Sequence, residues 1–275
     1  MELFLKQQVR QDDPRMAAVY AHFQKNLSDI IAFGVGSGAK VVVSTVGSNL
    51  RDCSPFGSLH RASLAAAKAA EWEDLYQAAG VLETQGKYAE AVAQYQRAAQ
   101  VDDQFADLQF RLGRCQAALG RHEEARRYFA KARDLDTLRF RTDSRLNEII
   151  RRVAGEWQTQ GVRLADTEAA FVQASADGIP GQEWFYEHVH LKFRGNYLVA
   201  RQLAEQVVQC LAEPTGGGAG VSAATTGVSP AVRSDGIRPF LSAAECAQRL
   251  GLTDWDRLCQ EEEMNRRTSR PPCVV

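Results

Sequence analysis

Two stretches of the chain carry one pattern: GKYAEAVAQYQRA at residues 86–98 and GRHEEARRYFAKA at residues 120–132. Each begins with a glycine and places small residues on both sides of one aromatic residue. The aligned pairs are Gly86 and Gly120, Ala91 and Ala125, Tyr95 and Phe129, and Ala98 and Ala132. Small residues let helices approach closely, and the aromatic ring fills the space between them. The pattern therefore predicts a repeated pair of packed helices.

The repeated unit resembles the tetratricopeptide repeat, whose signature is a period of about 34 residues with two helices per unit. We place the repeats at about residues 72–105 and 106–139. Because two repeats cannot bury their outer faces alone, helices at 61–71 and at about 143–159 are expected to cap them. The sequence thus predicts an all-α helical-repeat module over residues 61–160.

The segments on either side of the repeats alternate as in an α/β protein. Residues 14–35 have apolar residues at helical spacing. The next stretch, KVVVSTV at residues 40–46, is β-branched and apolar on both faces, which is typical of a buried parallel strand. A second short strand is expected at 162–166, before a helix over 195–212. These elements predict an α/β unit interrupted by the repeats, in a chain that is helix-rich overall.

This organisation predicts five segments. Residues 1–60 and 161–213 form the two parts of the α/β unit, on either side of the repeat module at 61–160. Residues 214–237 are rich in Gly, Ser, Thr and Ala and form a flexible linker. Residues 238–275 recover a helical pattern and form a C-terminal tail.

Composition excludes several classes of function. The chain has 275 residues, a net charge of −1 and 45% hydrophobic residues, so nothing marks a nucleic-acid-binding protein. Its six cysteines include no CxxC pair, which excludes a zinc knuckle or a redox motif. The first residues contain no long apolar region, so no signal peptide and no membrane span are expected. We expect no cofactor and leave the cellular location open, with the cytoplasm as the default.

The stretch WFYEHVHLKFRGNYLVA, residues 184–200, places a carboxylate three residues before a histidine. One turn makes Glu187 and His190 neighbours, and a carboxylate beside an imidazole can fix its tautomer and stabilise the imidazolium. The alternative is a loop histidine that bonds to the backbone. Glu187, His188 and His190 could also ligate a metal. The sequence shows no further group of ligand residues that would complete such a site, so no metal is assigned.

This stretch resembles the last sequence block of the SGNH/GDSL hydrolases. In that family the motif reads Asp-x-x-His, followed by an apolar residue and a glycine that opens the final helix. Here Glu187 replaces the aspartate, which keeps the charge and adds a methylene. The resemblance implies that His190 is a general base oriented by Glu187.

Three further strings, STV at 44–46, NLRD at 49–52 and PFGS at 55–58, extend the resemblance. Together with the repeats they resemble a bacterial group in which an SGNH-like domain carries tetratricopeptide repeats. The resemblance covers about residues 1–212. It implies a partial, flavodoxin-like three-layer α/β unit that hydrolyses or transfers an acyl ester. The Ser-, Gly- and Asn-bearing blocks of that group would lie upstream of Met1, and because the catalytic serine is then missing we expect this chain alone to be inactive. A longer parent protein could be membrane-anchored.

The resemblance also implies an oxyanion-hole donor in a Gly-x-Asn segment after a strand. The sequence GSN at residues 47–49 fits, which makes Asn49 the candidate; the alternative is an asparagine that caps local backbone. Ser37, in the sequence GSG at residues 36–38, comes nearest to the Gly-Asp-Ser-like turn that carries the family's nucleophile. It ends a helix and precedes a strand, the reverse of the required order, so no nucleophile is assigned in this chain.

The rival interpretation is an interaction protein. The concave face of the repeats would bind a peptide or a partner helix, and the α/β unit would be a scaffold. Polar residues on the first helix of each repeat would line that surface: Glu73, Gln77, Gln109 and Arg114. Alternatively, these helices merely pack on the α/β unit. Three tryptophans at helical spacing, Trp72, Trp157 and Trp255, are expected to be packing residues.

Overall fold

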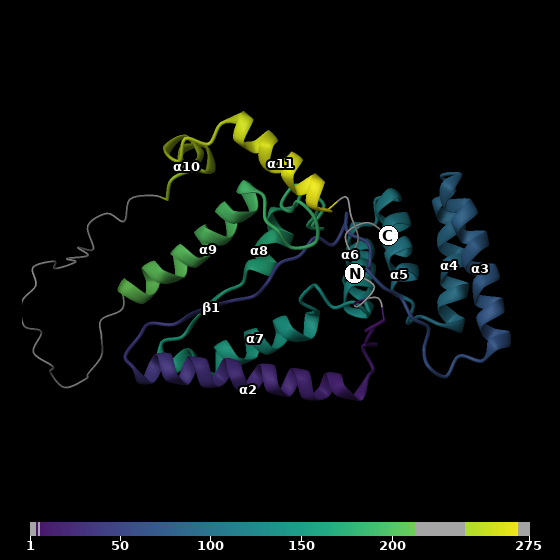
Figure 1. Ribbon diagram of the computed structural model, residues 1–275, viewed down its shortest axis with the longest axis horizontal. Coiled ribbons are helices and arrows are strands. Elements are labelled where there is room, and N and C mark those ends of the chain that lie inside the picture. The colour runs from purple at the N-terminus through teal and green to yellow at the C-terminus, as the bar shows by residue number, and fades with distance from the viewer. Residues whose placement is uncertain (1–3, 5, 213–239, 269–275) are drawn as a thin grey trace, which may run out of the picture.

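Helices dominate the computed structural model, which describes residues 4, 6–212 and 240–268 (Figure 1). The elements are α2 (Pro14–Gly36), β1 (Val42–Ser44), α3 (Ala66–Thr84), α4 (Tyr88–Val101), α5 (Ala106–Ala118), α6 (His122–Leu135), α7 (Ser144–Glu156), the 3-10 turn η1 (Gln158–Gln160), β2 (Arg163–Ala165), α8 (Thr167–Ala174), α9 (Phe193–Ala212), α10 (Ala243–Arg249) and α11 (Asp254–Thr268). The linker predicted at 214–237 lies outside the described residues. No helix in the described part of the chain is long and apolar enough to cross a membrane.

The helices α3 to α6 form two antiparallel hairpins, α3 with α4 and α5 with α6, and α4 packs on α5. Each hairpin turns at a glycine with φ +72°, Gly86 or Gly120, a conformation that suits glycine because it lacks a Cβ. The six small and aromatic repeat positions are at most 1% exposed: Ala91, Tyr95, Ala98, Ala125, Phe129 and Ala132. The predicted tetratricopeptide-like helical repeat is confirmed.

The expected capping helices differ from the prediction. Residues 61–71 form no separate helix, because α3 begins at Ala66 and runs directly into the first repeat. The helix predicted at 143–159 exists as α7, but it packs mainly on α2 and on both strands. It therefore belongs with the sheet, where its apolar face covers the strands.

The sheet has two parallel strands in the described residues, with Val42 opposite Arg163 and Ser44 opposite Ala165. The helices α2 and α7 lie on one side of the strands, and α8 and α9 lie on the other (Figure 1). Each strand is three residues long, shorter than the predicted stretches. In this part of the chain there is only a small sheet between helices, not the several strands of a complete doubly wound domain.

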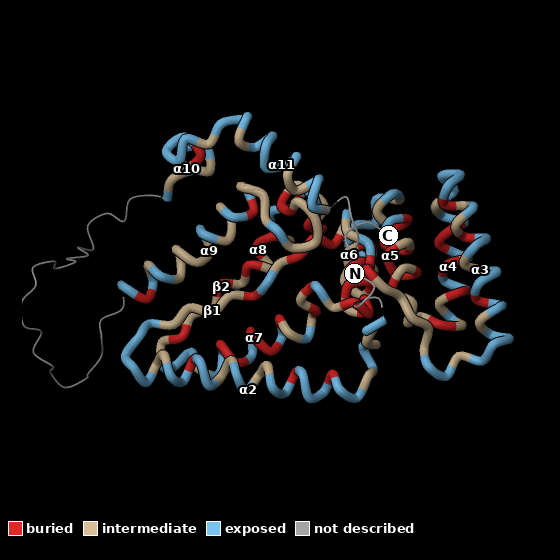
Figure 2. Tube along the Cα trace, in the orientation of Figure 1, coloured by how far each residue is buried: buried red, intermediate tan, exposed pale blue. Residues whose placement is uncertain are grey.

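Buried positions concentrate in the repeat helices and where α2 meets α7, whereas α11 is largely exposed (Figure 2). Trp72 is 1% exposed and Trp157 packs at the edge of the core around α2 and α7. Trp255, on α11, is 70% exposed, so its prediction as a packing residue is wrong. Helical spacing alone does not show whether a partner surface faces the ring.

Gly113 provides a test of the close packing between α5 and α6. A Cβ at this position would lie 2.8 Å from the ring of Phe129. We expect Gly113→Ala to lower the free energy of unfolding by about 1–3 kcal/mol, because the ring has little room to move. A Cβ at Gly155, an exposed helical position, would meet nothing within 4 Å. There alanine should stabilise by about 0.5–1 kcal/mol. Urea unfolding of both variants checks the opposite signs; equal effects would contradict the packing.

Candidate functional site

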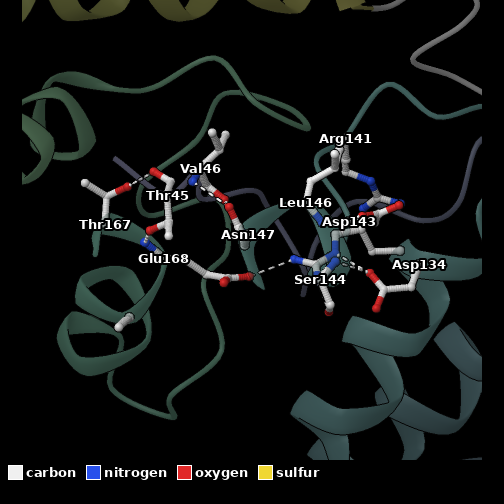
Figure 3. A network of polar contacts seen from close by, with 12 residues as sticks. Thr45, Val46, Asp134, Arg141, Asp143, Ser144, Leu146, Asn147, Thr167 and Glu168 are labelled. Carbon is white, nitrogen blue, oxygen red and sulfur yellow. Dashed lines mark hydrogen bonds and ion pairs between the residues drawn. The ribbon is translucent and has the colours of Figure 1, made fainter. Parts of the chain in front are cut away.

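A polar network fixes the loop that leaves β1 (Figure 3). The Thr45 hydroxyl donates to Asp166 Oδ1 at 2.8 Å and accepts from the Glu168 N–H at 3.0 Å. The next residue, Val46, exchanges two backbone bonds with the side chain of Asn147, at 2.9 and 3.0 Å. Because these partners lie after β2 and on α7, the loop is held at the end of the sheet where both parallel strands finish.

Asn49 joins this loop to the predicted acid–histidine motif. Its N–H donates to the His188 carbonyl at 3.0 Å, and its Nδ2 donates to the Glu187 carbonyl at 2.9 Å. Its Oδ1 accepts from the Asp52 N–H at 2.9 Å. The structure therefore brings Asn49 to the motif. Both polar atoms of its buried side chain are bonded to backbone groups, Nδ2 to the Glu187 carbonyl and Oδ1 to the Asp52 N–H.

The Glu187 carboxylate organises the turn that follows it. It accepts the N–H of His188, of Val189 at 3.2 Å and of His190 at 2.8 Å, and it touches Nδ1 of both histidines. His190 is 66% exposed on its side chain, whereas His188 is largely buried. Glu187 and His190 are thus neighbours as the spacing predicts, and the same carboxylate also caps backbone.

No nucleophile is positioned by this arrangement. Nε2 of His190 makes no hydrogen bond with any residue that the structure describes. Ser37 is the C-cap of α2, and its hydroxyl donates to the Gly34 carbonyl at 2.8 Å. Among the described residues no group of three or more His, Cys, Asp or Glu side chains could hold a metal ion.

His188 lies in an apolar pocket. The rings of Phe56 and Phe140 meet its ring edge-on, at centroid distances of 5.1 and 6.4 Å. Burial, with the positive charge of Arg141 and the neighbouring His190, lowers the pKa of His188 to about 4. Its imidazole is therefore neutral at pH 7 in the folded protein.

This shift predicts a loss of stability in mild acid. The folded His188 has a pKa of about 4, below the value of about 6.5 for an unfolded histidine. The unfolded chain therefore binds the extra proton first, and stability present above pH 6.5 is lost as the pH falls toward 4. From pH 7 to pH 5 the free energy of unfolding should drop by about 2 kcal/mol.

Urea unfolding at both pH values measures this drop. The variant His188→Gln should lose the pH dependence that is due to this residue, while His122→Gln, at an exposed position on α6, keeps it. Equal pH dependence in the wild type and His188→Gln would show that contact with Glu187 outweighs burial.

A second candidate site lies on the concave face of the repeats. A cavity of about 640 Å³ separates α3 and α5 from the chain segment at 54–58. The rings of Trp72 and Tyr76 stack 4.7 Å apart, and the Arg111 guanidinium lies 5.3 Å from the centre of the Tyr76 ring. The segment is tied to α5 because the Asp107 N–H donates to the Ser58 hydroxyl at 2.9 Å.

The structure separates the four predicted partner-binding residues. Glu73 and Arg114 line this cavity. Gln77 is exposed and donates to Glu73 at 2.6 Å. Gln109 is 2% exposed and its Nε2 donates to the Asp103 carbonyl at 2.9 Å, so its prediction as a surface residue is wrong.

Among the cavity residues that sequence reasoning missed are Tyr76, Phe110 and Arg111, which lie on the same helices as Glu73 and Arg114. Tyr76 lies three residues after Glu73, and Phe110 lies four before Arg114. Residues three or four apart share a helix face. Including the positions three and four residues before and after each predicted polar residue would have found them.

Comparison with known proteins supports the helical module. A family model described as a tetratricopeptide repeat matches residues 82–139, from the end of α3 through α6. Tetratricopeptide repeats typically mediate protein–protein interaction. No curated protein and no solved structure matches the chain. The resemblance to SGNH/GDSL hydrolases has no support in these comparisons.

Proposed function

We propose that this chain is a protein-interaction protein whose concave repeat face binds a segment of a partner protein. The observation that carries the proposal is the cavity of about 640 Å³ on the helices α3 and α5 of the two repeats. The rival interpretation of the sequence is thereby preferred to the hydrolase, because the repeat match supports it directly.

The cavity suits a peptide with mixed side chains. Tyr76 and Phe105, the half-buried aromatic residues of the lining, provide apolar area for a peptide side chain at a small entropic cost. Glu73 contributes a negative group at the edge, and Arg114 contributes a positive one. The Arg114 side chain is 57% exposed and lies 3.4 Å from the Glu83 carboxylate, so its guanidinium remains accessible to a partner carboxylate.

A bound segment would contact more than the repeats. The segment 54–58 forms one wall of the cavity and follows the loop from β1. We infer that the α/β parts at 1–60 and 161–213, with α7 added to them, hold the repeats at 61–143 and complete the binding surface. The remaining proposed segments are the linker at 214–237 and the tail at 238–275.

Affinity capture with paired variants tests this function. The wild-type chain, a Glu73→Lys/Arg114→Glu variant and Arg127→Glu are immobilised and exposed to an extract of the source cells. Arg127 is exposed on α6, where it pairs with Glu123. Proteins retained by the wild type and Arg127→Glu should be lost by the double variant, with all three equally folded by circular dichroism. Identical retained proteins on all three would contradict the proposed surface.

A second candidate function rests on the contact of Asn49 with Glu187 and His188 across 138 residues of sequence. In this proposal His190 acts as a general base oriented by Glu187, and Asn49 donates to an oxyanion, as in a partial SGNH-like three-layer unit. The donor is weakened because the Asn49 amide is already bonded to the Glu187 carbonyl. We expect the chain alone to be inactive, because no described hydroxyl bonds to His190.

Hydrolysis of p-nitrophenyl acetate by the wild type, His190→Ala and His122→Ala tests this candidate. Turnover that falls by about 100-fold or more in His190→Ala alone would establish general-base catalysis. Equal background rates in all three are the result expected of the chain alone, whereas turnover that His190→Ala abolishes would contradict the expected inactivity; neither outcome affects the interaction function.

A further inference from the structure

A separate cavity of about 380 Å³ lies where the repeats meet the α/β unit. Its walls come from α6, α7, α8 and the loop 47–50 that follows β1. It shares no lining residue with the concave cavity. The carboxyl ends of parallel strands are where open α/β sheets bind ligands, and this cavity lies at that end of β1.

One wall of this cavity contains a cluster of ion-paired and hydrogen-bonded side chains, of which Figure 3 labels Asp134, Ser144 and Glu168. Arg133 is almost fully buried; it pairs with Asp134 at 3.0 Å and Glu168 at 3.1 Å and donates to the Ser144 hydroxyl at 2.7 Å. Arg151 makes its ion pairs with Asp166 at 2.7 Å and Glu168 at 2.8 Å. These two cations pair with three carboxylates, Asp134, Asp166 and Glu168, so the cluster carries one net negative charge and offers no cation to an anion.

A third arginine in the lining is different. Arg126, on α6, is partly buried and makes no hydrogen bond or ion pair with any residue that the structure describes. Its guanidinium carries five N–H donors and no acceptor. A partly desolvated cation without a counter-charge favours an anion beside it.

Ser48 supplies an independent observation. It lines the same cavity, is 3% exposed, and its hydroxyl oxygen has no hydrogen-bond partner among the described residues. The N–H groups of Gly47 and Ser48 likewise make no hydrogen bond within the described part of the chain. An unpaired buried polar group costs about 1–3 kcal/mol, and successive free N–H groups are a common anion-binding arrangement.

We propose that this cavity binds a small organic anion, whose carboxylate or phosphate accepts hydrogen bonds from Arg126 and the Ser48 region. Leu50, Phe171 and Val172 contribute apolar side chains to the lining. They fit an apolar group attached to the anion. The ligand class is therefore an acid with a hydrophobic part, recognised by its charge at one end and its shape at the other.

Isothermal titration calorimetry on the full chain tests the site with three probes: benzoate, phenyl phosphate and the neutral benzamide. We expect saturable binding of at least one anion and none of benzamide, because the donors need a charged acceptor. The tighter of the two anions identifies the natural group as a carboxylate or a phosphate. Equal binding of benzoate and benzamide, or no binding of either anion at tens of millimolar, would overturn the proposal.

Two variants locate the binding. Arg126→Gln removes the cation and should weaken anion binding about tenfold, which corresponds to about 1.4 kcal/mol. Ser48→Ala should weaken it as well while leaving the ligand-free protein at least as stable in urea, because an unpaired hydroxyl is removed. The matched control Arg127→Gln, one residue along on the exposed face of α6, should bind as the wild type does. Equal loss in Arg127→Gln and Arg126→Gln would place the anion elsewhere.

Discussion

Replacement of Trp72 by alanine should lower the free energy of unfolding by about 3–5 kcal/mol. The ring is 1% exposed, stacks on Tyr76, and donates from Nε1 to the Asp102 carbonyl at 3.0 Å. The centroid of the His60 ring lies 4.5 Å from that of Trp72, and the two rings meet edge to face. Removing the indole therefore leaves a cavity between α3 and the segment that precedes it, and the Asp102 carbonyl loses its donor.

Trp255→Ala is the matched control, since the same side chain is removed from a position that is 70% exposed. It should change the free energy of unfolding by no more than about 0.5 kcal/mol. Urea unfolding followed by far-ultraviolet circular dichroism avoids the loss of tryptophan fluorescence in either variant. Similar losses for Trp72→Ala and Trp255→Ala would contradict the burial of Trp72 in the repeat core.

Replacement of Arg141 by methionine should also cost about 3–5 kcal/mol, the usual effect of leaving a buried charge without its partner. Arg141 pairs with Asp136 at 3.1 Å and donates to the carbonyls of Asn49 and Cys53 at 3.1 and 3.0 Å. Burial raises the pKa of Asp136, and Arg141 opposes that shift. Without Arg141 the pKa of Asp136 should rise further.

The loss of Arg141 should loosen one particular segment of the chain. Arg141 holds the loop that carries Asn49 and that leads to the segment 54–58 beside the concave cavity. Amide hydrogen exchange of residues 47–58 should quicken in Arg141→Met, together with the lower urea midpoint. Arg127→Met, which removes an exposed ion pair, should cost only about 0–1 kcal/mol. Unchanged exchange in this segment would show that Arg141 does not position it.

The repeats could be predicted from sequence because their signal is local. The period of small and aromatic residues reports packing within one hairpin, and Gly86 and Gly120 report its turn. The capping box of Ser242 and Glu245 is equally local, since it depends on residues within one turn of helix. The partners of α7 could not be predicted, because packing on α2 and on β1 depends on segments about 100 residues or more away in the chain.

In the candidate sites, too, contacts between residues close in sequence could be predicted and contacts between distant segments could not. The Glu187–His190 contact follows from a spacing of three residues. The burial of Gln109 does not, because the Asp103 carbonyl that it contacts is fixed by the turn between α4 and α5. Ser48 and Arg126 became a candidate pair only when the loop after β1 and α6 were brought to one cavity. No spacing in the sequence connects them.

Site-specific photo-crosslinking tests the concave surface most directly. A benzoyl-phenylalanine placed at Glu73 or at Arg114 lies on the wall of the proposed cavity, and one placed at Arg127 lies on an exposed face of α6. The account predicts that irradiation in the source cells yields the same discrete adduct from Glu73 and Arg114 and none of that mass from Arg127. An adduct found equally at all three positions, or only at Arg127, would contradict partner binding on the concave repeat face.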